Sequence, residues 1–330
     1  DRATPILANS CPIVAKRGGR VDRRKARGYH RVMRDAMDHL RGLLARHWHA
    51  KGRETQIDGL FLSHAEQPSD IMRSIYRTSF CVVLQGSKIS LLGEQAWRYT
   101  QGQYLIASMD LPVTAQIVEA SPDRPYMAFS LTIDPAMIAE LVVELEDASP
   151  AAERGPLVVG ALDPSLLDPL IRLFALLDTP RDLPVLAPLI RREIVWRLLT
   201  GPHGGSLRQI GLAGGAIARI ARVLRWITDH YADPISIDEL AGMAAMSAAS
   251  LHRHFKAATT LTPIQFQKQV RLQAARRLLL SETNEAAAAG FAVGYESASQ
   301  FNRAYRRRFG PPPSRAVRAI RKDVTADLEV

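Results

Sequence analysis

Two helix-turn-helix patterns lie in tandem near the carboxyl end of the chain, and they constrain its fold more than any other feature. The first is ISIDELAGMAAMSAASLHRHFK, in which Ser236 and Glu239 form a capping box for a short helix that begins near Ile237. The second is NEAAAAGFAVGYESASQFNRAYRRRFG. In each pattern a serine, Ser247 or Ser297, caps a second helix. The sequence therefore predicts a carboxyl-terminal all-α domain of two similar units.

Each of these second helices is expected to have an apolar side and a polar side. Leu251 with Phe255, and Phe301 with Tyr305, are apolar pairs at i,i+4 spacing that should turn inward. Gly294 is expected to provide the positive φ of the second turn. The candidate DNA-contacting residues are Ala249, Ser250, His252, Arg253, Lys256, Ser297, Ser299, Asn302, Arg303 and Arg306.

The segment LTPIQFQKQVRLQAARRLLLS between the two patterns predicts one helix, with Thr262 as its cap and Pro263 at its first position. Ile264, Phe266 and Val270 are expected on its apolar face. About 18 residues, each rising about 1.5 Å, span about 27 Å. With the width of the joined helices added, this spacer holds two recognition helices near the roughly 34 Å between successive major-groove faces of B-DNA.

These residues resemble the AraC/XylS family of bacterial transcription regulators over about residues 216–322. The resemblance is carried by MSAASLHRHFK, LTPIQFQKQVRLQAARRLL and GYESASQFNRAYRRRFGPPPS. It implies that the base-facing residues are Ala249, His252 and Arg253 in the first unit and Ser299, Asn302 and Arg303 in the second. Two positions depart from the family: Ala245 replaces a turn glycine and Gly290 lies inside a helix, each at a cost of about 1 kcal/mol. The first unit is therefore expected to be the weaker or more mobile reader.

The net charge of +10 is distributed unevenly. Residues 216–322 hold 17 Lys and Arg against 7 Asp and Glu, whereas residues 55–215 hold 12 against 18. A basic domain binds polyanions through counterion release. Arg306, Arg307 and Arg308 are therefore expected to contact phosphate, the alternative being a solvated helix face.

Residues 1–54 form a basic tail with a possible amphipathic helix. The first 28 residues are expected to lack structure, and the helix that follows has an apolar stripe of Met33, Met37, Leu40, Leu44 and Trp48. The chain has only two cysteines, Cys11 and Cys81, without a CxxC pair, and no apolar run as long as a membrane span. A cytoplasmic protein without membrane contact is expected.

From residue 55 to 145 the pattern changes to β-type runs: GLFLSHA, SIYRTSFCVVLQG, KISLLG, WRYTQGQYLIAS, TAQIVEAS and YMAFSLTI. Turn residues separate them, which predicts five to seven strands in a small barrel or sandwich. Residues 146–205 are expected to hold two helices, over 164–177 and 185–199, and a flexible hinge, GPHGGS, at 201–206. The DNA-binding domain then covers 206–322, and 323–330 form a tail. The fold class is α+β.

The 55–145 segment resembles the AraC-type N-terminal domain, a cupin-like barrel, through FCVVLQGSKISLLG, YLIASMDLPV and PYMAFSLTIDP. This resemblance implies a sensor of small molecules or stress, followed by dimerising helices. The candidate effector-binding residues are Cys81, His64 and Tyr126. Strand alternation places Cys81, Val83 and Gln85 on one face and Phe80, Val82 and Leu84 on the other, and either face could be the interior.

Two of these candidates have alternative interpretations. An activated Cys81 thiol would react with an aldehyde or an oxidant, whereas buried cysteine is more often inert packing. His64 is more readily a hydrogen-bonded barrel residue than a metal ligand, because the strand region has no second histidine near it in sequence.

The sequence predicts a sequence-specific transcription factor, a ligand-responsive activator that binds promoter DNA as a homodimer and acts with RNA polymerase. Its effector is a small molecule of unknown identity, and no metal or cofactor is expected. An enzyme is not expected, because GxxxxGK[ST], GxSxG and HExxH motifs are absent. Two alternatives stay open: a non-specific architectural nucleic-acid binder, and a cupin enzyme with an accessory basic domain.

Overall fold

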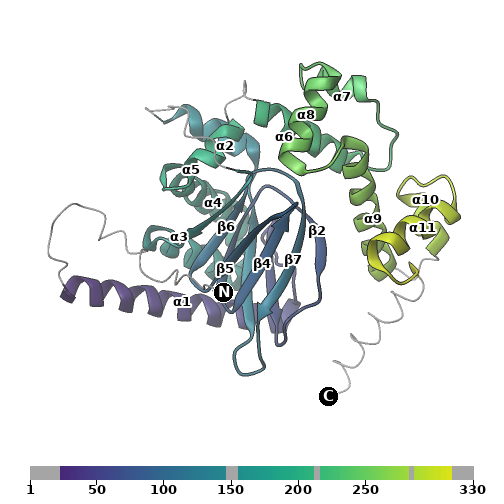
Figure 1. Ribbon diagram of the computed structural model, residues 1–330. Helices are drawn as coiled ribbons and strands as arrows, with labels where there is room; N and C mark the ends of the chain where they lie inside the picture. The colour runs from purple at the N-terminus through teal and green to yellow at the C-terminus, as the bar shows by residue number, and fades with distance from the viewer. Residues whose placement is uncertain (1–22, 146–154, 212–215, 282–285, 314–330) are drawn as a thin grey trace, which may run out of the picture.

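The computed structural model describes residues 23–145, 155–211, 216–281 and 286–313, which form two packed β-sheets and two groups of helices (Figure 1). Sheet A has the strand order β1-β8-β3-β6-β9, and sheet B has the order β2-β7-β4-β5. All strand pairs are antiparallel. The strands are β1 (Leu60–Ala65), β2 (Met72–Tyr76), β3 (Ser79–Gln85), β4 (Ser87–Leu92), β5 (Gln95–Thr100), β6 (Gln103–Ala107), β7 (Leu111–Glu119), β8 (Tyr126–Thr132) and β9 (Leu157–Ala161).

Residues 55–145 contain eight strands and β9 follows them, so the expected five to seven strands in that segment was too few. Two of the β-type runs each contain a turn: one splits at Arg77 and Thr78 into β2 and β3, and the other at Gln101 and Gly102 into β5 and β6. Strand β9 lies beyond residue 145 and pairs with β6, where Val159 is opposite Leu105. The barrel therefore includes a strand from the part of the chain expected to be helical.

Five helices lie on the outer face of sheet A: α1 (Arg23–Lys51), α2 (Pro135–Val143), α3 (Pro164–Ala175), α4 (Leu183–Thr200) and α5 (Gly204–Gly211). Phe80, Val82 and Leu84 of β3 are buried in this layer. Helix α1 begins at Arg23, so the expectation of no structure is wrong for residues 23–28, while the rest of the basic tail lies outside the described residues. None of the helices in the described ranges combines the length and apolarity needed to cross a bilayer.

The expected hinge at 201–206 is wrong, because these residues enter a packed helix. Helix α5 begins at Gly204, and Ser206 and Leu207 are buried. A Cβ atom at Gly204 would collide with the carbonyl of Leu199. The glycines here permit close packing of backbone on backbone, which composition alone does not distinguish from flexibility.

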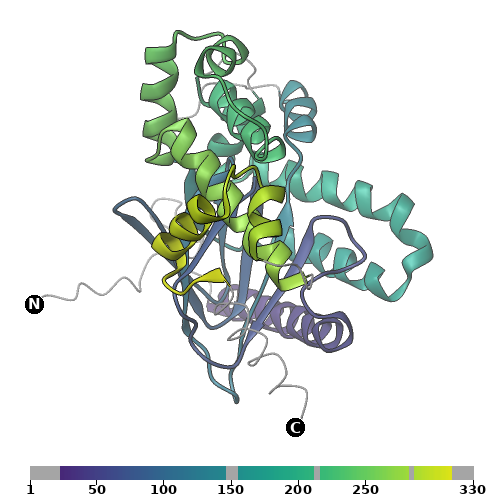
Figure 2. The same cartoon turned by 90° about the vertical axis from the view of Figure 1, so that its right-hand side faces the viewer.

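The carboxyl-terminal helices form the two helix-turn-helix units, joined by one long helix (Figures 1 and 2). They are α6 (Ala216–Asp229), α7 (Ile237–Met243), α8 (Ala248–Thr259), α9 (Pro263–Ser281), α10 (Ala286–Ala292) and α11 (Ala298–Phe309). The core of the first unit is continuous with the apolar interior between the two sheets. The second unit has a separate core.

A buried carboxylate marks the junction between the barrel and α6. Asp110, between β6 and β7, is 6% exposed and accepts a hydrogen bond from the Thr78 amide at 3.3 Å. Burial raises the pKa of Asp110, against the opposing influence of Arg77, the Thr78 amide, and Arg225 and Thr228 of α6. The carboxylate therefore links the sheet region to the carboxyl-terminal helices at a cost in desolvation.

We predict that Asp110→Asn changes the pH dependence of unfolding. Because the pKa of Asp110 is raised in the folded state, its favourable contribution is full below the unfolded-state pKa, near 3.8, and is lost as pH rises through the folded value. The free energy of unfolding of the wild type minus that of Asp110→Asn should fall from mildly acidic to neutral buffer. Urea unfolding of both proteins measures it, and a difference that rises with pH would contradict the assignment.

Candidate nucleic-acid interface and barrel interior

Helices α8 and α11 are built alike. The side chains of Ser247 and Ser297 cap them, each accepting a hydrogen bond at 3.3 Å from the amide three residues later. Each helix buries its i,i+4 pair, Leu251 with Phe255 and Phe301 with Tyr305. The helix starts and inward stripes predicted from the sequence are confirmed.

The outward faces of the two helices have the same spacing. Counting from the serine cap, positions two, five, six and nine are exposed in both helices. These positions share one helical face because they follow i, i+3, i+4 and i+7 spacing. Ser250 and the cap Ser297 are half-buried, and the exposed residues are Ala249, His252, Arg253 and Lys256 in α8, and Ser299, Asn302, Arg303 and Arg306 in α11.

The two turns differ in their glycines. Gly294 has the expected positive φ of 84°, and Ala245 takes a φ of 49° at the matching place in the first unit. Gly290 lies in α10 where a Cβ atom would stand 2.8 Å from the ring of Phe301. Its helix-propensity cost is therefore offset by close packing of α10 on α11.

Arg271 of α9 ties the two units together, a role that sequence reasoning missed. Its guanidinium donates to the carbonyl of Gly294, in the second turn, at 2.6 Å. It also donates to the carbonyls of Tyr231 at 2.6 Å and of Ala232 and Asp233 at 3.1 Å, all in the loop after α6. One side chain thus limits rotation of one unit against the other.

The spacer helix agrees with the prediction except at its first turn. Its 19 residues span about 28 Å. The Thr262 amide donates to Gln265 Oε1 at 3.0 Å, and the Gln265 amide donates to Thr262 Oγ1 at 3.3 Å, which makes Thr262 a reciprocal cap. Ile264 was expected on the apolar face but is 58% exposed, so that assignment is wrong.

The arginine run at the end of α11 divides between two surfaces. Arg306 and Arg307 are exposed, whereas Arg308 is half-buried and donates to Gln269 Oε1 at 3.0 Å. Burial, together with the nearby charge of Arg73, lowers the pKa of Arg308 to about 10. Arg308 therefore faces the barrel, and the expected phosphate contact is kept only for the first two arginines.

Besides the shared apolar core, the β4–β5 turn and strand β2 contact the carboxyl-terminal helices. At the β4–β5 turn, a Cβ atom on Gly93 would stand 2.8 Å from Thr260 Cγ2, at the end of α8. On β2, Arg73 donates to the carbonyl of Arg308 at 3.3 Å, and Gln273 of α9 donates to the Arg73 carbonyl. Figure 2 shows α9, α10 and α11 in front of the sheets.

The register decides which candidate effector residues face the space between the sheets. Cys81 is paired with Ser130 on the inward face of sheet A, and Tyr126 is buried in the same apolar interior. His64 lies on the opposite face, where its ring stacks on Trp48 of α1 with centroids 5.6 Å apart. Burial lowers the pKa of His64. His64 is therefore part of the helix-covered layer and does not line the barrel interior.

Hydroxyl groups connect strands of sheet B inside the barrel. Ser90 Oγ lies 3.1 Å from the hydroxyl of Tyr76 and 3.2 Å from that of Tyr99. The ammonium group of Lys88 stands over the Tyr76 ring, 5.5 Å from its centre. Lys88 was not among the predicted site residues. It lies two residues before Ser90 in KISLL, and this spacing, which puts both residues on the same inward face of a strand, could have identified it.

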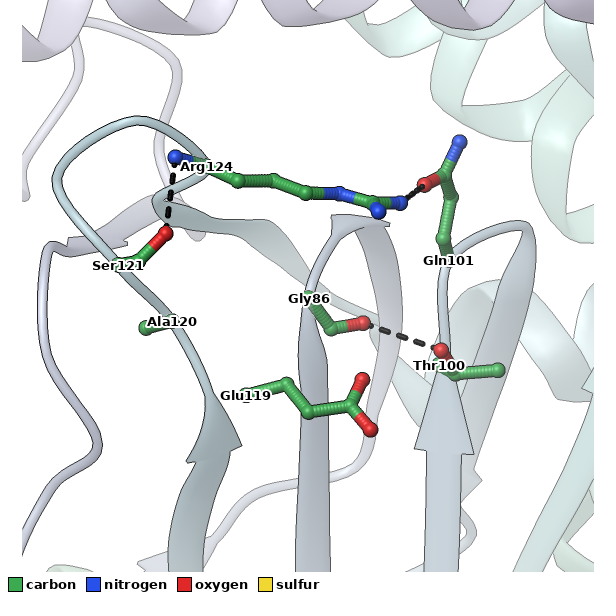
Figure 3. A pocket seen from close by; sticks show the side chains of 7 residues that line it. All are labelled: Gly86, Thr100, Gln101, Glu119, Ala120, Ser121 and Arg124. Atoms are coloured by element: carbon green, nitrogen blue, oxygen red, sulfur yellow. Dashed lines mark hydrogen bonds between the residues drawn. The ribbon is translucent and has the colours of Figure 1, made fainter.

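A surface pocket of about 350 Å³ lies at the end of sheet B away from Gly93 (Figure 3). Its polar groups are paired with one another: Arg124 donates to Gln101 Oε1 at 3.0 Å, and Thr100 Oγ1 to the Gly86 carbonyl at 3.1 Å. Glu119 is bonded to Arg98. The pocket offers a ligand few free groups and lies about 20 Å, one strand length, from the DNA-binding half. Across the described ranges, no three His, Cys, Asp or Glu side chains gather where a metal ion could bind.

Two family models match the chain. The AraC-type transcriptional regulator N-terminus matches residues 56–206, and a helix-turn-helix domain matches residues 240–319. The HTH-type transcriptional activator RhaS of Escherichia fergusonii is 31% identical over 147 residues, covering 44% of this chain and 50% of that protein. RhaS of Shigella dysenteriae is 26% identical and covers 70% of this chain and 82% of that protein. The chain thus spans about half the length of the relatives to which it is more than 30% identical.

Solved structures of ToxT from Vibrio cholerae have the same fold. The apo form aligns with a TM-score of 0.56 at 9% identity, over 80% of this chain and 98% of that chain. The wild-type form bound to an unsaturated fatty acid aligns with a TM-score of 0.54 at 10% identity, over 80% of this chain and 96% of that one. These likenesses establish the arrangement of a sheet domain followed by a helical domain.

We predict that the Cys81 thiol is slow to react at neutral pH. Burial raises its pKa, and Lys88, Arg53 and the Ser130 hydrogen bond offset burial only in part, so the fraction of thiolate is small. In a Cys11→Ser background, iodoacetamide should label the native protein more slowly than the urea-unfolded chain, and faster as the pH rises. Native labelling as fast as that of the unfolded chain would support a reactive sensor instead.

Proposed function

This chain belongs to the AraC family of transcriptional regulators, and on that premise we propose that it reads a specific promoter under the control of a small molecule. The observation that carries the proposal is the matched outward spacing of α8 and α11, joined by a single helix of 19 residues. Two recognition helices on one chain suit two successive major grooves. The basic balance of residues 216–322 adds sequence-independent attraction to the phosphates.

We assign direct base reading to the arginines of each face. Arg253 and Arg303 occupy the sixth position after the cap, and both are exposed. An arginine in the major groove is suited to bidentate hydrogen bonds with guanine. Ala249, His252, Ser299 and Asn302 are proposed as the neighbouring base contacts, and Ser250, Lys256, Ser297 and Arg306 as contacts to the backbone.

We propose that the barrel controls the reader through sheet B. Its strands touch the end of α8 at Gly93 and the α9–α11 junction at Arg73. A ligand that binds one arrangement of these contacts more tightly than another shifts the population toward that arrangement. The contact between Arg73 and Arg308 brings two cations together, so a small gain elsewhere can release it.

The remaining parts of the proposal follow from the family. The relatives named here are activators, so we propose activation, with RNA polymerase as a partner. We propose no catalytic role. We propose a cytoplasmic location, because the promoter DNA that such a protein binds lies there. We also propose a homodimer, for which the exposed apolar residues Val185, Leu186 and Leu189 of α4 form a candidate surface.

We predict that Arg253→Ala and Arg303→Ala each weaken binding to a specific duplex by about 1–3 kcal/mol, because each removes base-edge hydrogen bonds. The duplex is selected by the wild-type protein from a randomised pool, and affinity is measured by fluorescence anisotropy at fixed salt. On a scrambled duplex of equal composition the losses should be far smaller.

Arg181→Ala is the matched control for these variants. It removes the same charge from a side chain that is 90% exposed and remote from both recognition helices. It should leave the specific affinity unchanged. Equal losses on the selected and scrambled duplexes would favour the architectural, non-specific binder.

We predict that Leu189→Glu converts the dimer to a monomer, because a carboxylate at the centre of an apolar contact remains charged and unpaired. Light scattering after size-exclusion chromatography measures the mass. Ile71→Glu, on the β1–β2 loop, is the control and should leave the mass unchanged. A wild-type monomer at micromolar concentration, or a dimer unaffected by Leu189→Glu, would reject this surface.

A further inference from the structure

The space between the two sheets contains a cation in an otherwise apolar and phenolic setting. On β4, Lys88 lies opposite Tyr99 of β5 and Ile117 of β7, on the face of sheet B that contributes to the interior. Lys88 is half-buried and has Tyr76, Tyr126 and Cys81 as its electrostatic neighbours. These neighbours come from both sheets, so the ammonium group is enclosed between them.

No acid balances this charge within the described part of the chain. The salt bridges of the structure do not include Lys88, and the groups that act on its pKa are phenols and a thiol rather than a carboxylate. Burial works against the charged form, while the hydrogen bond with Tyr76 and the neighbouring Tyr126 and Cys81 favour it and raise the pKa above its ordinary value. Lys88 therefore has no carboxylate partner among the described residues.

One further group beside Lys88 remains available to a ligand. The hydroxyl of Tyr126 makes no hydrogen bond to any residue in the described ranges, although the side chain is buried. Cys81 and Ser130, which are bonded to each other on the facing sheet, keep partial exposure. By contrast, Tyr76, Ser90 and Tyr99 bond to one another. The Tyr126 hydroxyl beside Lys88 therefore differs from these bonded groups.

We propose that the barrel binds a small organic monocarboxylate, its carboxylate held between the Lys88 ammonium group and the Tyr126 hydroxyl, and its apolar body between the sheets. This inference rests on the proposed function, since it names the chemical class of the effector. A single lysine matches a single negative charge, which favours a monocarboxylate over a phosphate or a dicarboxylate. Val83, Leu105 and Val113 are fully or almost fully buried in the same interior and suit an apolar body.

The position of Lys88 also explains how such a ligand would be sensed. Lys88 is near the start of β4, and the same strand leads to the Gly93 turn that lies against Thr260. Tyr76 is on β2, the strand whose Arg73 contacts the second helix-turn-helix unit. A carboxylate that draws these two strands together therefore acts on the elements that contact both readers.

The test uses the full chain and a panel of acetate, octanoate, benzoate and phenylacetate, each paired with its uncharged amide. Isothermal titration calorimetry measures affinity for the wild type, Lys88→Met, Tyr126→Phe and the control Lys51→Met, whose lysine is exposed at the end of α1. We expect at least one acid to bind the wild type and Lys51→Met equally. Its affinity should fall at least about tenfold with Lys88→Met, which corresponds to about 1.4 kcal/mol, and by a smaller factor with Tyr126→Phe.

The outcomes separate this inference from the proposed function. Amides that bind as tightly as their acids, or acids that bind Lys88→Met as well as the wild type, would overturn the anion site while leaving a ligand-binding barrel. Failure of every probe to bind the wild type would overturn it as well. Affinity for the selected duplex, measured on the same samples, confirms that Lys88→Met is folded. A wild type that does not distinguish the selected duplex from a scrambled one defeats the proposed function itself.

Discussion

One apolar core runs without interruption from the interior of the barrel into the first helix-turn-helix unit, and the arrangement of the two halves depends on it. Val83, Leu111 and Leu157 of the sheets belong to the same buried cluster as Val223 of α6 and Phe255 of α8. Separating the halves would expose this surface to water at about 25 cal/mol for each Å² of apolar area. The first helix-turn-helix unit is therefore packed as part of the barrel domain.

The second reader is attached by a different kind of contact. Its core is separate, although α9 and the partly buried Tyr231 pack against both cores. Polar groups make the other contacts: Arg271 bonds to four carbonyls around the turns, and Arg73 bonds to the Arg308 carbonyl. Hydrogen bonds at a partly wet junction contribute little net free energy each and are directional. This contrast favours the second unit as the one that changes position, whereas the Ala245 turn had indicated the first.

Local features were predictable and register was not. The serine caps, the Phe255 and Tyr305 stripes and the spacer helix follow from spacing within about one turn of helix, which neighbouring residues determine. The mistaken hinge at 201–206 and the missing strand β9 depend on contacts with distant segments, such as that of Gly204 with Leu199. The face occupied by His64 likewise depends on strand pairing, because a shift of one residue exchanges the faces.

One face of sheet B lines the barrel interior and the other contacts the carboxyl-terminal helices, an arrangement that strand alternation allows. Successive residues of β2 and β4 point to opposite sides, so Tyr76 and Lys88 face the interior while Arg73 faces α9 and α11. A strand is stiff along its length, so a displacement caused by a ligand at an inward residue is carried to the outward ones. The polar attachment of the second reader can follow such a displacement, whereas the shared apolar core of the first resists it. Control by a ligand would thus consist of turning one recognition helix relative to the other, which decides whether both fit successive grooves of a single duplex.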